Sequence, residues 1–381
     1  MNTVPQPLLD FIIQTRQHLH RNPELSFQEY ATTNYLADIL HAHNIRVIDT
    51  SMDTGIIAII EGSSSGPHIA LRADIDGLPV NEDPSHDVIS RTDGVMHACG
   101  HDLHMSSLLG ASLLLSELSD TFSGSITLVF QPAEEQGTGA NQVMQTHVLD
   151  DVSTIIGYHN DPRYAPGIIA ISDQPMMAAA GSFDITLTGE GTHGAYPENG
   201  RSPIEAAATL VTALQTIVSR NISPLDATVV SITQVHAGNT YNVIPESATI
   251  AGTVRTLNQK TSQLVERRMR SLAESIATGF GLTSRLRWSF PGAPLVSDAS
   301  LVDLAKRSVP HYANLINPTP SMGGEDFLLY LRNMPGLFAF IGSNGRPNAA
   351  SWHSPQYLGF DDMLSTAVLY YVNTALDVLK H

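Results

Sequence analysis

Apolar residues recur at two alternating spacings along the first 180 residues of the chain. Apolar positions three and four residues apart predict helices, whereas short runs rich in β-branched residues predict buried strands. The helices predicted in this part span 8–20, 28–43 and 103–118, and the strands span 56–61, 68–72, 125–130 and 152–158. Strands that alternate with helices predict an α/β fold, with a mixed, largely parallel sheet flanked by helices.

The pattern changes at about residue 182, where strands begin to follow one another more closely. Strands are predicted at 182–189, 228–236, 247–255 and 282–290, and helices at 203–220 and 261–280. This βαββαβ order is typical of a small ferredoxin-like antiparallel sandwich. A helix (300–309), a strand (336–341) and a closing helix (361–379) follow. We therefore expect one discontinuous domain of residues 1–180 and 291–381, into which residues 181–290 are inserted as a second domain.

Composition and charge narrow the class of protein. The 381 residues include 20 Lys and Arg against 37 Asp and Glu, a formal net charge of -17. This charge argues against nucleic acid and against an anionic membrane as partners. No apolar run reaches the roughly 18–20 residues of a membrane helix. The start of the chain has no secretion signal pattern, and a single cysteine cannot form an internal disulfide, so we expect a cytoplasmic protein.

The segment 96–104 concentrates groups that bind metal. It contains three histidines, an aspartate and the only cysteine of the chain within nine residues. Three predicted strands also end in acids or a histidine, and ligands collect beyond the carboxyl ends of strands in such sheets. Imidazole, carboxylate and thiolate are the ligands that divalent ions take at hydrolytic sites. The candidate residues at predicted strand ends or loops are Cys99, His101, Glu134, Glu135, His159 and His353.

Each candidate has a plainer explanation when it is taken alone. A buried cysteine usually fills space in the core, and a carboxylate pair such as Glu134 and Glu135 often forms a solvated turn. Taken together, the six residues favour a pair of divalent ions, with zinc, manganese, cobalt and nickel all open. One glutamate would bind metal and the other would take a proton from the attacking water. His97 and His104 are expected to lie behind the ligands or to cap a helix.

Several longer motifs point to a known family. They occur in order along nearly the whole chain: 20–26 (HRNPELS), 71–79 (LRADIDGLP), 97–102 (HACGHD), 130–135 (FQPAEE), 191–197 (GTHGAYP), 241–245 (YNVIP), 252–255 (GTVR) and 323–327 (GGEDF). With these motifs the chain resembles the M20 metallopeptidase family. Within it, the chain is most similar to the amidohydrolase branch of hippurate hydrolases, auxin-conjugate hydrolases and N-acyl-amino-acid deacylases.

The resemblance implies a two-metal catalytic domain that carries a lid domain, through which such proteins usually form homodimers. It implies that Glu134 is the general base and that the ligands are Cys99, His101, Glu135, His159 and His353. In the lid domain it implies substrate-binding roles: His193 would stabilise the oxyanion, and Asn242 and Arg255 would hold the carboxylate and carbonyl of the substrate. Gly324 would keep a backbone loop close to the substrate.

We therefore expect a metal-dependent amidohydrolase that cleaves an N-acyl amino acid, hippurate-like or N-acetylated, into a carboxylate and a free amino acid. The alternatives are an aminopeptidase or dipeptidase on the same fold, a catalytically inactive binding module, and a thiol enzyme with Cys99 as nucleophile. Residues 103–106 (LHMS) and 191–193 (GTH) depart from the usual pattern of the branch. Both lie beside the expected site, so the acyl group and the amino acid stay open.

Overall fold

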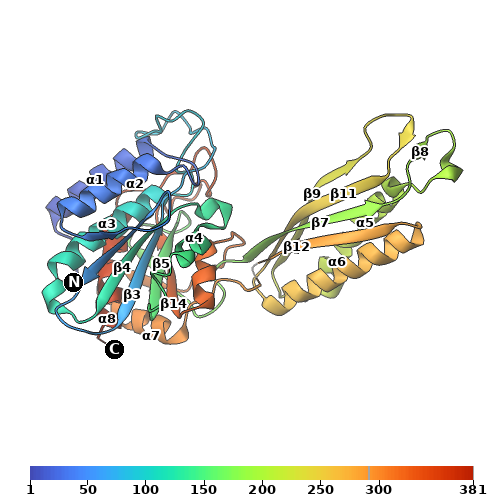
Figure 1. The fold of residues 1–381 in the computed structure, drawn as a ribbon. Coiled ribbons are helices and arrows are strands. Elements are labelled where there is room, and N and C mark those ends of the chain that lie inside the picture. Colours follow the sequence, from blue (N-terminus) through green and yellow to red (C-terminus); the bar gives the residue numbers. More distant parts are fainter. Residues whose placement is uncertain (291, 381) are drawn as a thin grey trace. The chain divides into compact units, whose positions relative to one another are not determined.

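A computed structural model describes residues 1–290 and 292–380 of the chain (Figure 1). The chain divides into two compact units: the first comprises Met1–Gln174, Val296–Thr319 and Asp326–His381, and the second comprises Pro175–Leu295 and Pro320–Glu325. Pro291 and His381, which the expected segment 291–381 includes, lie outside the described residues. Residues 175–180, 292–295 and 320–325, which we expected in the first domain, belong to the second unit. The catalytic role of the first unit and the lid role of the second stay predictions.

The first unit is built on a mixed sheet of eight strands. In spatial order these are β1 (Arg46–Ile48), β2 (Ile56–Glu61), β4 (Ser125–Gln131), β3 (His68–Asp74), β5 (Thr154–Asp161), β14 (Gly336–Gly342), β6 (Ile168–Ala170) and β13 (Asn314–Ile316). The four central strands β4, β3, β5 and β14 are parallel, while β2 and β6 flank them antiparallel. The predicted largely parallel sheet is therefore confirmed, and the carboxyl ends of β3, β4 and β5 share one edge.

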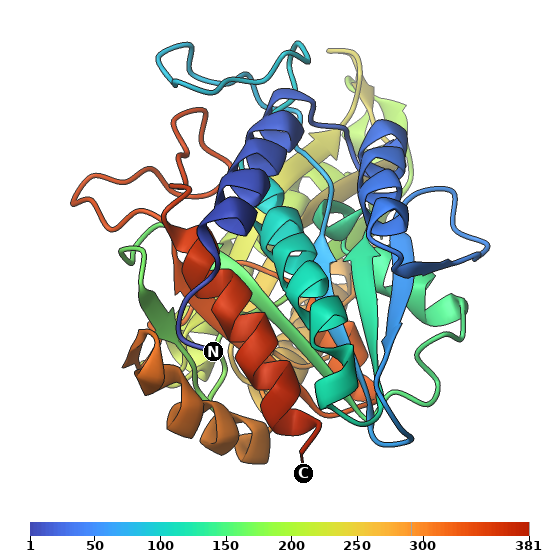
Figure 2. The same cartoon turned by 90° about the vertical axis from the view of Figure 1, so that its left-hand side faces the viewer.

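Helices cover this sheet. The unit contains α1 (Gln6–Arg21), α2 (Tyr30–Ala42), α3 (His101–Glu117), α4 (Gly139–Gln145), α7 (Ala299–Ser308) and α8 (Met363–Val378). Figure 2 shows α1, α3 and α8 side by side against one face of the sheet. Because α3 lies between the sheet and its neighbouring helices, every residue from His101 to Leu115 is buried. The other face carries α4 and the 3-10 helix η5 (Asp326–Arg332), whose Phe327 lies against Gly157 of β5.

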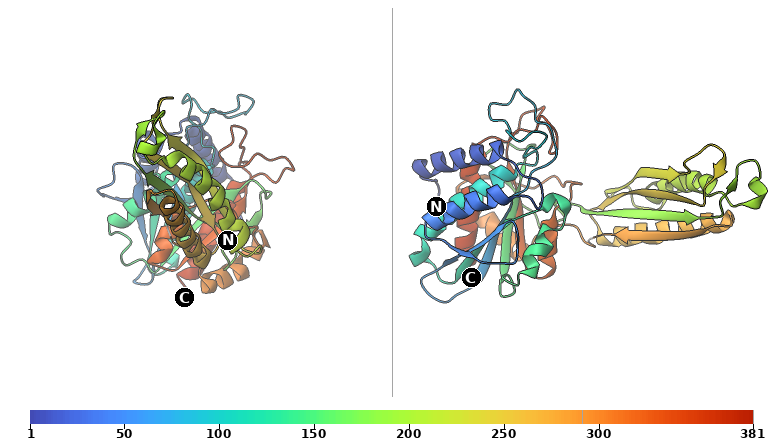
Figure 3. Two further views of the ribbon diagram at one scale, coloured as in Figure 1. Left: turned by 90° about the vertical axis from the view of Figure 1, so that its right-hand side faces the viewer. Right: turned by 45° about the horizontal axis from the view of Figure 1, so that its top comes forward.

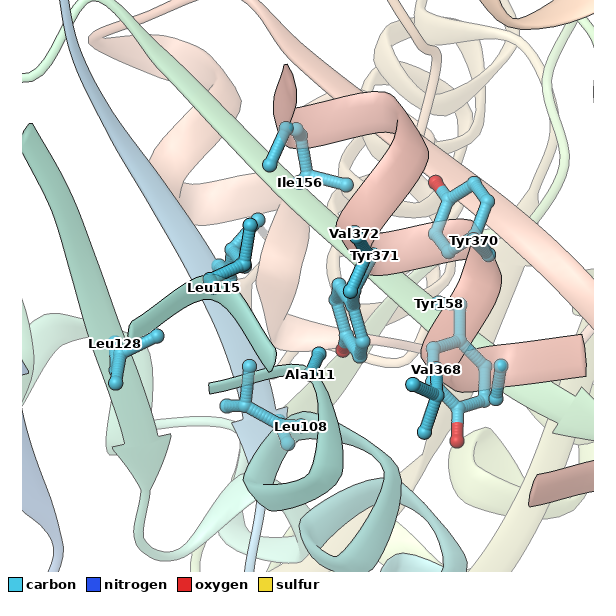
Figure 4. Close-up of a cluster of buried hydrophobic side chains, with 14 of the residues drawn as sticks. Leu108, Ala111, Leu115, Leu128, Ile156, Tyr158, Val368, Tyr370, Tyr371 and Val372 are labelled. Carbon is cyan, nitrogen blue, oxygen red and sulfur yellow. The ribbon is translucent and has the colours of Figure 1, made fainter. Parts of the chain in front are cut away.

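The core between α3, α8 and the sheet holds the start of α3 in place. Leu108 and Leu115 of α3, Val368 of α8, and Leu128 and Ile156 of the sheet are almost completely buried there (Figure 4). Each such side chain contributes about 1.5–3 kcal/mol when it leaves water. Since α3 begins at His101, this apolar contact fixes a candidate ligand beside the strand ends.

The second unit is a four-stranded antiparallel sheet with two helices on one face. The sheet order is β12 (Thr283–Ser289), β7 (Ala179–Thr188), β11 (Ser247–Thr256) and β9 (Thr228–Ala237). The helices α5 (Pro203–Asn221) and α6 (Gln259–Gly279) lie side by side (Figure 3). Their core includes Ile185 and Ile250 from the sheet and Leu210 and Met269 from the helices. Along the chain these elements follow the predicted βαββαβ order, with the short strands β8 (Thr192–His193) and β10 (Val243–Ile244) added.

Among the described residues, none of the helices is both long and apolar enough to cross a bilayer.

Candidate metal centre

The five predicted metal ligands come together beyond the strand ends of the first unit. Their donor atoms form two groups, in each of which all the atoms lie within 4.8 Å of one another. The first group is Cys99, His101 and His159, and the second is Cys99, Glu135 and His353. Cys99 belongs to both groups. A ligand atom lies about 2.0–2.3 Å from a zinc ion, so separations of this size can be spanned by one ion.

Local structure places two of these residues differently from the sequence expectation. His101 was expected before a helix, but it is the first residue of α3. The preceding residue, Gly100, has a positive φ of 80°, and a Cβ there would collide with Tyr357 and Asn160. His159 was expected just after a strand, but it lies inside β5. His353 sits in a loop with a positive φ of 64°, its backbone N–H donates to Ala98 at 2.9 Å, and 55 % of its side chain is exposed.

Hydrogen bonds on the far side of two imidazoles orient these candidate ligands. The Nδ1 of His101 donates to the backbone oxygen of Asp76 at 2.9 Å, with the Asp76 carboxylate at 3.2 Å. The Nδ1 of His159 donates to the backbone oxygen of Asn160 at 2.7 Å. Because these oxygens accept, both Nε2 atoms are left with a lone pair, as metal-bound histidines require. The Nε2 of His159 lies 3.3 Å from the Sγ of Cys99.

The electrostatics of this cluster fit a divalent cation. The Nε2 of His101 and the Oε1 of Glu135 are buried, and neither makes a hydrogen bond to any described residue. Leaving such groups unsatisfied costs about 1–3 kcal/mol each, which a cation between them would offset. Burial lowers the pKa of His101, but the carboxylates of Asp74, Asp76 and Glu135 raise it to about 10. These carboxylates favour a positive charge at the imidazole, which a metal ion on Nε2 would supply in place of a proton. Thiolate, imidazole and carboxylate together suit zinc and its neighbours among the transition metals.

The thiol of Cys99 is not activated as a nucleophile. Burial, followed by the nearby carboxylates of Glu135 and Glu134, raises the pKa of Cys99 well above its ordinary value. Reactive cysteines need the opposite, a lowered pKa in a positively charged and accessible environment. This setting argues against the alternative of a thiol enzyme.

The carboxylate doublet follows a turn with a strained backbone. Ala133 adopts the left-handed conformation, with φ 52° and ψ 41°, which costs a residue with a side chain about 1–2 kcal/mol. The backbone N–H groups of Glu134 and Glu135 both donate to the Asp76 carboxylate, at 3.2 Å and 3.0 Å. One donor atom each of Glu134, Glu135 and His101 lie within 4.8 Å of one another. Glu135 is also grouped with Cys99 and His353, while the Oε1 of Glu134 accepts the backbone N–H of Asp326 at 3.3 Å.

Asp76 is the residue that the sequence analysis missed. It accepts hydrogen bonds from His101 and from the carboxylate turn, whereas Asp74 accepts from Nδ1 of His104 at 2.6 Å. The other ring nitrogen of His104 accepts the backbone N–H of Asn160 at 2.9 Å. Both ring nitrogens of His104 are thus engaged in hydrogen bonds, which agrees with its expected place behind the candidate ligands.

Comparisons with known proteins identify the family. The family model of peptidase family M20/M25/M40 matches residues 70–377 of the chain. This chain belongs to peptidase family M20/M25/M40. It is a metal-dependent amidohydrolase of that family. Two relatives from Bacillus subtilis are similar over most of their length. N-acetyl-L-cysteine deacetylase is 42% identical, covering 91% of this chain and 83% of the relative, and N-acetylcysteine deacetylase is 41% identical over 97% of both.

A solved structure agrees with the fold. The dinuclear metal-binding peptidase of the M20 family from Bacillus subtilis superposes with a TM-score of 0.88 and 36% identity, covering 99% of both chains.

The four predicted substrate-binding residues of this M20 chain lie in the second unit, where they form two pairs. His193 on β8 lies next to Asn242, because Gly194 donates its N–H to the backbone oxygen of Asn242 at 2.8 Å and His193 faces Val243 of β10. Arg255 lies near the end of β11 and close to Gly324. The strand β11 spans Ser247–Thr256, so at about 3.3 Å per residue the two pairs lie roughly 25 Å apart. Within one chain, the structure does not bring these pairs together.

A buried charge cluster beside the metal centre predicts a pH effect on stability. The Nδ1 of His20 lies 2.8 Å from Asp102, and its Nε2 lies 2.9 Å from Glu82. Burial lowers the pKa of His20, but Asp102 and Glu82 outweigh burial and the nearby Arg16, so the pKa is raised. A histidine with a raised pKa stabilises the fold fully below about pH 6.5, and this contribution is lost as the pH rises through the folded-state pKa.

The substitution His20→Gln should therefore cost more unfolding free energy at about pH 6 than at about pH 9. Denaturant unfolding of both proteins across this range measures the difference, and subtracting the two curves removes the titration of all other groups. A cost that stays constant or grows with pH would show that His20 is not charged in the folded protein.

Proposed function

We propose that this amidohydrolase cleaves the amide bond of N-acyl amino acids and releases a carboxylate and a free amino acid. The observation that carries the proposal is the convergence of five donor residues into two groups that share Cys99, with the Glu134 carboxylate beside them. The names of two relatives at 41–42% identity point to the same substrate class, since both are deacetylases of N-acetylcysteine.

In this proposal, two divalent ions would be held by Cys99, His101, Glu135, His159 and His353. When bound, the ions would lower the pKa of the attacking water and polarise the amide carbonyl. Glu134 takes the proton from the water and passes it to the nitrogen of the leaving amino acid. The N–H of Asp326 donates to one oxygen of Glu134 and so helps to orient this carboxylate. The backbone bonds to Asp76 keep Glu134 and Glu135 apart in these two roles.

The recognition of the substrate is assigned to His193, Asn242, Arg255 and Gly324. An arginine suits the α-carboxylate of an amino acid, because its planar guanidinium group donates two parallel hydrogen bonds. The separation of these residues into two pairs supports the predicted homodimer, since a second chain can supply a pair that one chain does not. The dimer and the cytoplasmic location stay predictions.

A substrate panel on metal-loaded protein tests the proposal. The panel compares N-acetyl and N-benzoyl amino acids with dipeptides that have a free amino group, and elemental analysis of the same sample gives the metal content. We expect kcat/KM at least about tenfold higher for the acyl amino acids. A preference for dipeptides would instead identify an aminopeptidase or dipeptidase. Absence of turnover in fully loaded protein would identify a binding module.

A further inference from the structure

Three successive backbone N–H groups, those of Ala133 and of the Glu134–Glu135 doublet, donate to two buried carboxylates. Ala133 donates to the Oε1 of Glu29 at 2.9 Å, while Glu134 and Glu135 donate to the two oxygens of Asp76. Buried N–H groups need such partners, and the turn itself supplies none of these three. The first acceptor, Glu29, lies about a hundred residues earlier in the chain and takes no part in the proposed reaction.

The strained residue of this turn is the one that Glu29 holds. Ala133 is fully buried and has the left-handed backbone conformation that favours glycine. Such a conformation persists only when its surroundings fix it. Asp76 is already engaged by the next two amides and by the hydroxyl of Ser26 at 2.6 Å. The Ala133 amide is therefore fixed by Glu29 alone among the described residues.

Glu29 is itself held firmly against the turn. It immediately precedes α2, whose positive end favours an anion, and it is completely buried. Its second oxygen, Oε2, accepts the hydroxyl of Thr54 at 2.8 Å. The next residue, Gly55, approaches Pro132 so closely that an added Cβ would collide with the proline ring. The start of β2 and the start of α2 thus position Glu29 against the turn.

We propose that Glu29 is a positioning residue for the hydrolytic reaction. Its carboxylate keeps Ala133 in the left-handed conformation, and this conformation sets the directions in which the side chains of Glu134 and Glu135 leave the backbone. Without it, Ala133 relaxes, the amides turn away from Asp76, and the proton-transferring carboxylate moves. The inference rests on the proposed function, in which Glu134 transfers the proton and Glu135 binds metal.

Kinetics of metal-loaded variants test this role. Glu29→Ala should lower kcat about 10- to 100-fold, with KM within about threefold of wild type, because a small misplacement of a reacting group mainly affects the chemical step. Glu29→Gln keeps an oxygen for the Ala133 amide and should stay within about threefold of wild type. The matched control is Glu24→Ala. Glu24 accepts the N–H groups of Ala31 and Thr32 at 3.0 Å and 2.7 Å in the first turn of the same helix, so its loss should lower the melting temperature but not kcat.

A second substitution separates positioning from general loss of structure. Glycine adopts the left-handed conformation without strain, so Ala133→Gly removes much of the strain that the hydrogen bond to Glu29 has to offset. In the Ala133→Gly background, Glu29→Ala should therefore lower kcat by less than a third of the factor seen with alanine present. Equal losses in the two backgrounds would overturn the inference, as would a Glu29→Ala enzyme that behaves like the Glu24→Ala control.

Hydrogen exchange gives a readout that needs no turnover. In metal-free protein, the amides of Ala133, Glu134 and Glu135 should exchange at least about tenfold faster in Glu29→Ala than in wild type or Glu24→Ala. Unchanged exchange would contradict the inference whatever the enzyme does. If wild-type protein instead hydrolyses no acyl amino acid, the proposed function fails, while the exchange result still decides whether Glu29 holds the turn.

Discussion

The substitution Glu134→Gln is expected to lower kcat about 10²- to 10⁴-fold, the range that a positioned proton-transfer group contributes. Glutamine has the size of glutamate, and its amide oxygen can still accept the N–H of Asp326, which lies 3.3 Å from Glu134. The fold and the metal content should therefore stay close to wild type. The loss should fall on kcat rather than on KM, because the carboxylate acts only when the proton moves. Steady-state kinetics on samples of measured metal content check this.

The neighbouring substitution Glu135→Gln is the matched control. It makes the same chemical change one residue away, but Glu135 lies in the group with Cys99 and His353. It should reduce metal content as well as turnover, and added metal should restore part of its activity. If Glu134→Gln kept wild-type turnover with full metal content, the proton-transfer role would belong to another group.

Removal of metal is expected to abolish hydrolysis. Treatment with a chelator should leave a folded but inactive protein, and one or more of zinc, manganese, cobalt and nickel should restore activity. Because Cys99 belongs to both donor groups, Cys99→Ala should weaken binding of both ions. The weakening should exceed the roughly 10- to 100-fold loss that follows removal of a group behind a ligand. Competition titrations against a chelator of known affinity measure it.

An alkylating reagent supplies the opposing test. The thiol of Cys99 is buried and its pKa is raised, so it should react slowly with the reagent. A thiol enzyme would lose activity to the reagent and ignore the chelator. That pattern would overturn the metal assignment, and elemental analysis of freshly purified protein would then find no more than traces of metal.

Elements with a clear apolar period were predictable from the sequence. The strand 56–61 is observed with the predicted bounds, and the two long helices of the second unit are shifted by no more than two residues at either end. The sheet strands β1, β6 and β13 were not predicted, because three residues are too few to establish a period of two. The helix α4 was not predicted either, because seven residues are too few to establish a helical period.

The chemistry of the donors was predictable, but the residues that orient them were not. Cys99 and His101 are conspicuous by type and by their place in the segment 96–104, and His159 by its place near the end of a strand. The choice between Asp74 and Asp76 depends on where β3 ends and how the chain turns afterwards, which local sequence does not specify. Glu29 gives no local signal at all, since its contact with Ala133 depends on how β2 and α2 pack against the turn.

The position of β14 in the sheet has a consequence for synthesis of the chain. This strand fits between β5 and β6, but it is made more than 160 residues after them. Until it leaves the ribosome, the apolar edge of β5 has no neighbour on that side, and such an open edge invites aggregation. All four long strands of the second unit are complete by residue 289. The sheet of this unit can therefore form before the sheet of the first unit is complete. Nascent chains that end before residue 336 should therefore depend on chaperones far more than the finished protein does.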